Sequence, residues 1–175
     1  MDTKGLQEEY TDITDDLVSQ KLVELLTEKG YTITFAESCT GGLASAALVN
    51  TAGASEVLKC SLVTYANEAK RDLLGVREET LDKYGAVSQQ TACEMAQGAA
   101  SFAKADVAVS ITGIAGPGGG TKEKPVGLVY IACSVKGMVR AEKHIFTGDR
   151  LQVRQSSAQR ALQFAVTCIL EEKEI

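Results

Sequence analysis

The sequence predicts an α/β fold in which helices flank a sheet of about five strands that is parallel through most of its length, with an antiparallel hairpin at one side. Short apolar runs that suit buried strands alternate with segments of helical periodicity, and this alternation is typical of parallel βαβ units. Two later apolar runs, 126–135 and 139–146, are separated by a turn at Lys136-Gly137. This pair favours an antiparallel hairpin in the C-terminal half of the chain.

The first predicted helix begins after Thr14, a residue that caps helix N-termini, and ends at Lys29-Gly30. Its apolar residues recur at helical spacing and would face the core: Val18, Leu22, Leu25 and Leu26. A short apolar strand at 32–35 follows, and a turn at 36–42 leads into a helix at 43–49. The segment 51–55 has the composition of a loop.

In the middle of the chain, a second strand at 61–65 leads into a helix at 67–74 that Gly75 ends. The segment 78–84 adds one or two helical turns. A longer helix begins near Ser88, and its inward stripe consists of Ala92, Met95, Ala96, Ala99, Phe102 and Ala103. The small residues of this stripe favour close packing on the sheet.

A buried strand at 107–111 precedes the glycine-rich stretch 113–120. The last helix begins near Asp149 or Arg150 and turns six apolar residues inward: Ala158, Ala161, Leu162, Ala165, Val166 and Ile169. No internal repeat or linker interrupts this pattern. We therefore expect an acidic N-terminal extension at 1–13 and a single domain at 14–175.

The composition is that of an ordinary globular domain, with 175 residues, 45% hydrophobic and 23% charged. No apolar run approaches the roughly 20 residues that span a bilayer, so we expect no membrane partner. The polar, acidic N-terminus resembles neither a signal peptide nor a transit peptide. A cytoplasmic location is the expectation that follows.

The net charge of −5 is concentrated at the start of the chain, because residues 1–30 hold eight acidic and three basic residues. The rest of the chain is neutral and has no stripe of lysine and arginine, which argues against nucleic acid as a partner. A ligand that carries a phosphate would need a local cationic site.

The turn at 36–42, Ala-Glu-Ser-Cys-Thr-Gly-Gly, has the composition of a site that attacks carbonyls or binds anions. A strand that ends in small polar residues and turns into a helix brings hydroxyls and free N–H groups together. We predict that Ser38 is a nucleophile. The N–H groups of Thr40, Gly41 and Gly42 could hold an oxyanion or a phosphate, or simply form an ordinary turn.

A serine nucleophile needs a base, and the only histidine, His144, falls within the predicted hairpin, where a purely structural histidine is the more common case. A lysine base is the known alternative. Lys70 follows the second strand at its C-terminal end, the sheet edge where Ser38 and Thr112 are also expected. As a base it must be neutral, so we predict that Lys70 is enclosed; the alternative is an exposed helix lysine.

The other candidate site residues each allow a functional and a purely structural interpretation. Tyr65 could relay a proton or be an ordinary aromatic residue, and Cys39 is a rival nucleophile without a histidine to form its thiolate. The glycine stretch 113–120 could cover a ligand or be a flexible connection. Arg150 could clamp a carboxylate or phosphate, or lie exposed beside a capping Asp149.

Metal chemistry is not expected, because one histidine and dispersed cysteines form no ligand cluster. The five cysteines have no C-x-x-C pair and are interpreted as reduced thiols that mostly fill the core: Cys39, Cys60, Cys93, Cys133 and Cys168.

Six motifs together resemble the CinA C-terminal domain family, whose members include stand-alone nicotinamide-nucleotide amidohydrolases. They are AESCTGG at 36–42, VTYANEAK at 63–70, GAVS at 85–88, TGIAGP at 112–117, KPVG at 124–127 and GDR at 148–150. The resemblance runs in order from about Val18 to about Leu170. The large N-terminal domain of full CinA proteins lies outside this match, so its pyrophosphatase activity is not expected here.

The resemblance implies a three-layer α/β/α fold with a mixed, mostly parallel sheet. It also implies a metal-free serine–lysine hydrolysis of nicotinamide mononucleotide to nicotinic acid mononucleotide and ammonia, with no cofactor. It implies Ser38 as nucleophile, Lys70 as general base and Tyr65 as an assisting group, with Thr112 and Arg150 in the substrate site. We expect seven further residues to belong to the substrate site: Glu37, Cys39, Thr40, Gly41, Gly42, Asn67 and Gly113. A homo-oligomer is possible, and two other functions remain open: a nucleotide-binding module without catalysis, and a cysteine amidase that uses Cys39.

Overall fold

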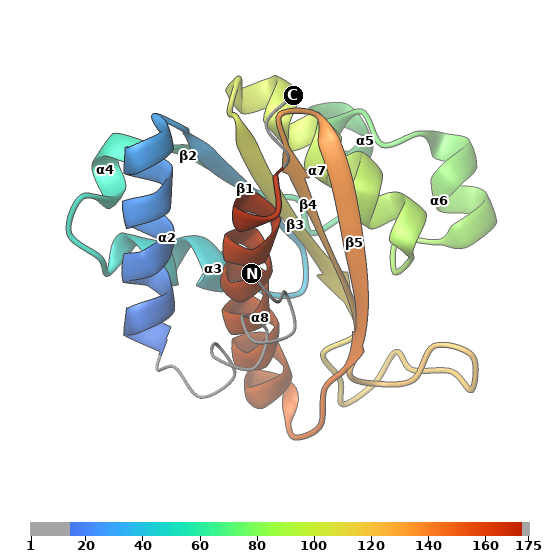
Figure 1. Ribbon diagram of the computed structural model, residues 1–175. Coiled ribbons are helices and arrows are strands. Elements are labelled where there is room, and N and C mark those ends of the chain that lie inside the picture. The colour runs from blue at the N-terminus through green and yellow to red at the C-terminus, as the bar shows by residue number, and fades with distance from the viewer. Residues whose placement is uncertain (1–14, 173–175) are drawn as a thin grey trace.

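The computed structural model describes residues 15–172 (Figure 1). The expected acidic extension at 1–13 and the capping residue Thr14 lie outside the described residues. Within them, helices cover both faces of one central sheet, so the three-layer α/β/α prediction is confirmed.

The sheet has five strands in the order β2-β1-β3-β4-β5. Strand β1 (Ile33–Glu37) pairs in parallel with both β2 (Leu58–Val63) and β3 (Val107–Gly113). Strands β4 (Leu128–Val135) and β5 (Met138–Ile145) form the predicted hairpin and join the sheet through antiparallel pairing of β3 with β4. Only β4 therefore runs against the other four strands, which makes the sheet mixed and mostly parallel.

One face of the sheet carries α2 (Asp15–Lys29), α3 (Leu43–Val49) and α8 (Arg150–Leu170). Large strand residues, among them Ile33, Phe35 and Val109, point to this face and form the main core with these helices. The four predicted inward residues of α2 and the six of α8 are all buried. Helical periodicity thus identified the core face of both helices correctly.

The other face carries α5 (Asn67–Leu74), α6 (Glu78–Tyr84) and α7 (Gln89–Ala103). Here the strands present alanines, Ala36, Ala108 and Ala132, to small residues of α7. Small side chains on both partners allow the close packing that the stripe on α7 predicts. The last two residues of the predicted stripe are exceptions, since Phe102 is 52% exposed and Ala103 is only half-buried.

Two boundaries differ from the predictions. Strand β2 begins at Leu58 and ends at Val63, earlier than the predicted 61–65, because the chain leaves the sheet after Thr64, whose N–H makes the last ladder bond to Glu37 O (2.9 Å). The predicted loop at 51–55 contains the start of a one-turn helix, α4 (Ala54–Val57), which follows Gly53 in a left-handed conformation.

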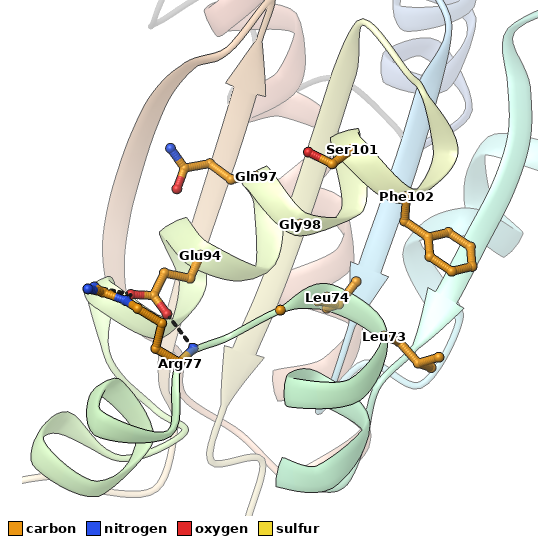
Figure 2. Close-up of a pocket in the computed structure, with 9 residues that line it drawn as sticks. Leu73, Leu74, Arg77, Glu94, Gln97, Gly98, Ser101 and Phe102 are labelled. Atoms are coloured by element: carbon orange, nitrogen blue, oxygen red, sulfur yellow. Dashed lines mark hydrogen bonds and ion pairs between the residues drawn. The ribbon is translucent and has the colours of Figure 1, made fainter.

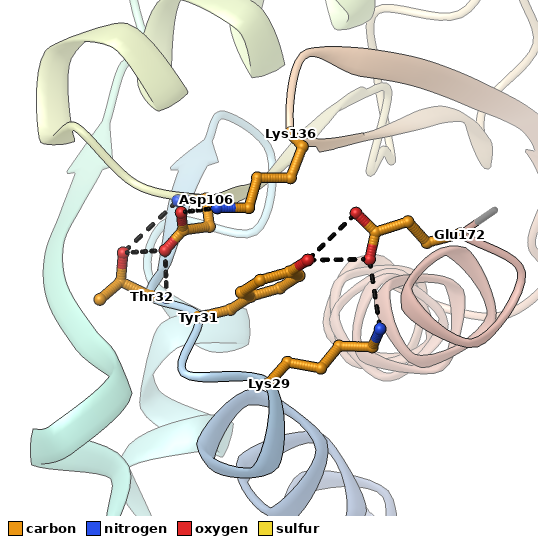
Figure 3. A network of polar contacts seen from close by, with 6 residues as sticks. All are labelled: Lys29, Tyr31, Thr32, Asp106, Lys136 and Glu172. Atoms are coloured by element: carbon orange, nitrogen blue, oxygen red, sulfur yellow. Dashed lines mark hydrogen bonds and ion pairs between the residues drawn. The ribbon is translucent and has the colours of Figure 1, made fainter. Parts of the chain in front are cut away.

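A polar network joins the sheet edge where β1 and β3 begin to the end of α8 (Figure 3). Asp106 accepts hydrogen bonds from Thr32 N (2.8 Å) and Lys136 Nζ (2.6 Å). The hydroxyl of Tyr31 donates to Glu172, and Lys136 Nζ lies 4.5 Å from the centre of the Tyr31 ring. The network is at the opposite end of β1 and β3 from the residues described next.

Candidate active site

A cavity of about 280 Å³ lies where β1 and β3 end. Parallel strands bring their C-terminal ends to one edge, and the chain segments that follow them form the walls. The cavity brings together seven of the predicted site residues: Ser38, Cys39, Tyr65, Lys70, Thr112, Gly113 and Arg150. Its size is near the lower end of the range for small-molecule sites.

Ser38 and Lys70 are in direct contact within this cavity. Ser38 directly follows β1 and continues the ladder to β3, since its N–H donates to Ile111 O (3.0 Å). Lys70 lies on α5 and is only 1% exposed. Its Nζ is 3.1 Å from Ser38 Oγ, 2.9 Å from Thr64 O and 3.1 Å from Tyr65 O. Lys70 is therefore enclosed, as a lysine base requires.

The surroundings of Lys70 suit a neutral amine. Among residues 15–172, no carboxylate forms an ion pair with Lys70, and burial lowers its pKa below the usual 10.5. A neutral amine has two N–H groups and one lone pair. The carbonyls of Thr64 and Tyr65 can accept the two N–H groups, and the lone pair can then accept the Ser38 hydroxyl proton.

The two rivals to this pair lack the corresponding chemistry. Burial raises the pKa of the Cys39 thiol to about 11, so the thiol is protonated near neutral pH. His144 lies on β5, where it bonds to Glu142 (2.8 Å) and stacks on Phe146. It does not line the cavity.

Five predicted site residues do not line the cavity. Asn67 is exposed at the start of α5, and Glu37, Thr40, Gly41 and Gly42 belong to the turn beneath Ser38. Glu37 is fully buried, and its carboxylate accepts bonds from the N–H groups of Gly42, Ala44 and Ser45 and from the Ser45 hydroxyl. Glu37 therefore caps α3, as a carboxylate at a helix N-terminus commonly does.

Two glycines allow the turn to adopt this shape. Gly41 and Gly42 have φ angles of 61° and 103°, a left-handed region that side chains rarely tolerate. The chain reverses here, so that the helix start faces the carboxylate of Glu37.

Most N–H groups of the turn already have an acceptor. Glu37 takes three of them, Ser38 N–H bonds to β3, Gly41 N–H donates to Ser38 O (3.1 Å) and Leu43 N–H donates to Thr40 O (3.4 Å). The backbone N–H of Cys39 interacts with its own thiol, whereas the Thr40 N–H has no acceptor within the described part of the chain. The Thr40 N–H is thus the N–H group of the turn that stays unpaired among the described residues.

The mouth of the cavity is formed by Arg150 and Tyr65. Arg150 donates from Nη1 to Gly116 O (2.7 Å) and from Nη2 to the Tyr65 hydroxyl (3.2 Å). Tyr65 is 62% exposed, so its phenol lies at the rim while its carbonyl contacts Lys70. One residue thus contributes to the rim with its side chain and to the lysine environment with its backbone.

The end of β3 and the glycine stretch form one wall. Thr112 is 1% exposed, and its hydroxyl donates to Ala86 O (2.8 Å). A side chain at Gly113 would collide with Val129, because an added Cβ would lie 2.6 Å from Val129 Cγ2. Glycines 116, 118 and 119 line the cavity, so this stretch does cover it.

The sequence predictions missed four contributors. Ala86 and Val87 line the cavity, and Lys124 holds their segment by donating to Tyr84 O (2.6 Å) and Val87 O (2.8 Å). Arg154 donates to Cys39 O and Thr40 O from α8. Lys124 and Arg154 are ordinary charged residues in sequence, and only the i, i+4 spacing of Arg150 and Arg154 could have indicated a shared face.

A larger groove of about 590 Å³ lies between α5 and α7, away from Ser38 (Figure 2). Its charged residues, Arg77 and Glu94, are paired with each other (2.5 Å). Gly98 lies against Leu74 at its floor. The groove contains no nucleophile beside a base, so its size does not make it the reactive site.

No group of three or more histidine, cysteine, aspartate or glutamate residues that could hold a metal ion occurs in residues 15–172. Over the same residues, no helix combines the length and the apolar character needed to cross a membrane.

Comparison with known proteins gives consistent results. The family model described as the CinA C-terminal domain matches residues 15–169. A CinA-like protein of Kosmotoga olearia is 48% identical over 158 residues, which are 90% of this chain and 38% of that protein. A relative in Clostridioides difficile (strain 630) is 54% identical over 140 residues, 80% of this chain and 32% of the relative. The chain thus spans about a third of the length of these curated relatives.

Solved structures have the same fold over nearly their whole length. The competence/damage inducible protein CihA from Agrobacterium tumefaciens has a TM-score of 0.87 and 42% identity, covering 91% of this chain and 98% of that chain. The competence damage-inducible protein A (ComA) from Klebsiella pneumoniae subsp. pneumoniae MGH 78578 has a TM-score of 0.89 and 33% identity, covering 92% and 100%. On the match to residues 15–169 and on these relatives, the chain belongs to the CinA C-terminal domain family.

Proposed function

We propose that this chain is an amidohydrolase that converts nicotinamide mononucleotide to nicotinic acid mononucleotide and ammonia through a Ser38 acyl-enzyme. The observation that carries the proposal is the contact of Lys70 Nζ with Ser38 Oγ at 3.1 Å, with Lys70 buried and its pKa lowered by burial. The names of the relatives describe competence and damage induction and specify no reaction. The substrate comes from the resemblance of the six motifs to nicotinamide-nucleotide amidohydrolases.

In the first step, Ser38 Oγ attacks the amide carbon while neutral Lys70 accepts the hydroxyl proton. The tetrahedral intermediate then collapses: the C–N bond breaks, and Lys70 returns the proton to the departing nitrogen, which leaves as ammonia. In the second step, water attacks the acyl-enzyme ester, Lys70 accepts its proton, and Ser38 Oγ leaves with that proton. Every proton transfer uses Lys70, so the scheme requires no metal or cofactor.

The oxyanion needs hydrogen-bond donors that are not already occupied. The Thr40 N–H meets this condition, and the Cys39 N–H, which interacts only with its own thiol, adjoins Ser38 as a second donor. A donor of this kind contributes about 2.7–4 kcal/mol to the transition state in comparable sites. The Ser38 turn then has a divided role, with Glu37 stabilising the helix start and Cys39 and Thr40 serving the reaction.

The phosphate of the substrate would bind at the mouth. Arg150 is the cation at the rim of the cavity, and its guanidinium can form a bidentate pair with a phosphate. Its present partners are a carbonyl and a phenol, both neutral, so a dianion is a stronger acceptor. The carboxamide would then point inward to Ser38, and Tyr65 would border the ring at the rim.

The test is release of ammonia from nicotinamide mononucleotide by the wild-type chain and by Ser38→Ala, Lys70→Ala and Cys39→Ala. We expect turnover by the wild type and by Cys39→Ala, and loss of at least 10³-fold in the other two. Ser61→Ala removes an exposed serine of β2 and serves as the matched control.

The alternatives predict different outcomes. Binding of nicotinamide mononucleotide without turnover by the wild type would make the chain a nucleotide-binding module and would overturn the proposal. An active Ser38→Ala together with an inactive Cys39→Ala would identify a cysteine amidase instead.

A further inference from the structure

Arg154 connects α8 to the backbone of the Ser38 turn. It lies one helical turn after Arg150 and is half-buried. Its Nε donates to Cys39 O (3.0 Å) and its Nη2 donates to Thr40 O (2.9 Å). Within residues 15–172 it has no carboxylate partner, so its guanidinium is committed to two consecutive peptide carbonyls.

The bond from Arg154 to Cys39 O also fixes the direction of the Thr40 N–H, because both groups belong to the same planar peptide unit. In a trans peptide the C=O and the next N–H are coplanar and point in opposite directions. The Cys39 carbonyl and the Thr40 N–H belong to one such unit, so holding the carbonyl toward α8 directs the N–H away from Arg154. The next peptide unit, between Thr40 and Gly41, is held at both ends: Thr40 O accepts a bond from Arg154, and Gly41 N–H donates to Ser38 O (3.1 Å).

The charge of Arg154 also reaches this part of the site. Burial dominates the raised pKa of the Cys39 thiol, and the positive charge of Arg154 opposes that shift. A cation that favours a thiolate at Cys39 also favours an oxyanion beside the same peptide units.

We propose that Arg154 is a positioning residue that directs the Thr40 N–H toward the oxyanion of the reaction. The inference rests on the proposed amide hydrolysis and assigns to Arg154 a part that is distinct from that of Arg150. Arg150 faces the cavity and would bind substrate, whereas Arg154 acts through the backbone of the turn.

The experiment compares steady-state kinetics on nicotinamide mononucleotide for the wild type, Arg154→Ala, Arg154→Lys and Arg160→Ala. Loss of one oriented donor lowers kcat by about 10²–10³-fold in comparable sites, so we expect a kcat loss of about 10²-fold in Arg154→Ala with KM within about threefold. The kcat of Arg154→Lys should lie between those of the wild type and Arg154→Ala, because a lysine ammonium keeps the charge but lacks the forked guanidinium that spans two carbonyls. Arg160→Ala removes an arginine of the same helix that binds Glu142 and should retain wild-type kcat.

An unchanged kcat in Arg154→Ala, a change confined to KM, or an equal kcat loss in Arg160→Ala would overturn the proposal. Thermal unfolding of each variant establishes that the assays are made on folded protein.

A second measurement separates this inference from the proposed reaction. If the wild type releases no ammonia, the proposed function fails, and amide hydrogen exchange then tests Arg154 without activity. Faster exchange by at least tenfold at Gly41 in Arg154→Ala, with α7 unchanged, would support control of the turn by Arg154. Unchanged exchange at Gly41 would refute it.

Discussion

The chemistry proposed for the cavity depends above all on the protonation state of Lys70. Among residues 15–172, the buried amine of Lys70 contacts two carbonyls and a serine hydroxyl and no carboxylate, so Lys70 gains little from its charge. Its pKa is accordingly lowered by burial, and the neutral form is the one that can take a proton from Ser38.

We therefore predict that kcat/KM rises with pH, with an apparent pKa below the 10.5 of a free lysine. The sign follows because the active form of Lys70 is deprotonated, and raising the pH increases its fraction. A pH series on nicotinamide mononucleotide, in buffers of constant ionic strength, measures this. Lys70→Arg, which stays protonated, should be inactive throughout the series; a rate that falls as pH rises over this range would contradict the assignment.

Arg150 should affect substrate binding more than chemistry. A hydrogen bond to a charged group contributes about 1.5–3 kcal/mol, so Arg150→Ala should raise KM for nicotinamide mononucleotide by about 10–100-fold and change kcat little. The matched substrate is nicotinamide riboside, which lacks the phosphate and should be nearly insensitive to the substitution. Gln155→Ala, an exposed change on the same helix, is the control. Equal KM values for wild type and Arg150→Ala would exclude the phosphate role.

Sequence reasoning at this scale identified side chains better than backbone groups. The composition of a strand-to-helix turn predicts Ser38, and the exclusion of His144 together with the motif resemblance predicts Lys70. The role of Glu37 and the unpaired N–H group of Thr40 depend on peptide orientations, which residue types do not encode. Tyr65 illustrates both cases, since its carbonyl contacts Lys70 while its phenol lies at the rim.

Among the elements, the pairing of α5 with α7 determines where Lys70 lies. Gly98 of α7 packs directly on the end of α5, and a Cβ added there would lie 1.8 Å from Leu74 O. Leu74 and Lys70 are one helical turn apart on α5, so a displacement at one is passed to the other. The two helices can approach this closely only because Gly98 has no side chain.

Gly98→Ala should therefore destabilise the protein, by up to about 2 kcal/mol once the helix propensity of alanine is subtracted from the roughly 1–3 kcal/mol that overpacking costs. Alanine gains about 1 kcal/mol in helix propensity over glycine, but the clash is with backbone that must move, so the steric cost prevails. Urea unfolding measures the change. Gln97→Ala, the exposed neighbour on α7, provides the control and should be nearly neutral; a Gly98→Ala protein as stable as wild type would show that α5 and α7 can separate without cost.

The extent of each element was predictable where local signals were strong. Helices α7 and α8 begin where Ser88 and Asp149 indicate, and the side chains of these two residues cap the helices. The ends of β2 were not predictable from local signals, because they depend on which of its residues pair with β1. The short helix α4 was missed for a similar reason: one turn is too short to have its own periodicity.

For the molecule as a whole, the two ends of β1 and β3 differ in what surrounds them. One end carries the cavity, and the other carries the network around Asp106 and Tyr31 (Figure 3). The three-layer arrangement was predictable from alternation of elements and the hairpin signal. The network was not, because it joins residues more than 70 positions apart, such as Thr32 and Asp106.

Asp106→Asn should lower stability and leave catalysis intact. It weakens the bonds to Lys136 and Thr32 at the far end of the sheet, and because the Asp106–Lys136 pair is largely exposed to solvent the loss of stability should be modest. Thermal unfolding should show a lower Tm, with kcat and KM for nicotinamide mononucleotide unchanged below it. Asp82→Asn, an exposed change on α6, is the comparison. A fall in kcat would mean that the two ends of the sheet are coupled.

The order of the site residues along the chain has a consequence for biosynthesis. Ser38, Lys70 and Thr112 precede α8, which supplies Arg150 and Arg154. A ribosome adds about 5–20 residues per second, so Ser38 and Lys70 leave the ribosome seconds before α8, whose Arg150 lines the cavity and whose Arg154 bonds to the Ser38 turn. The nascent chain therefore carries an incomplete cavity until α8 has been synthesised.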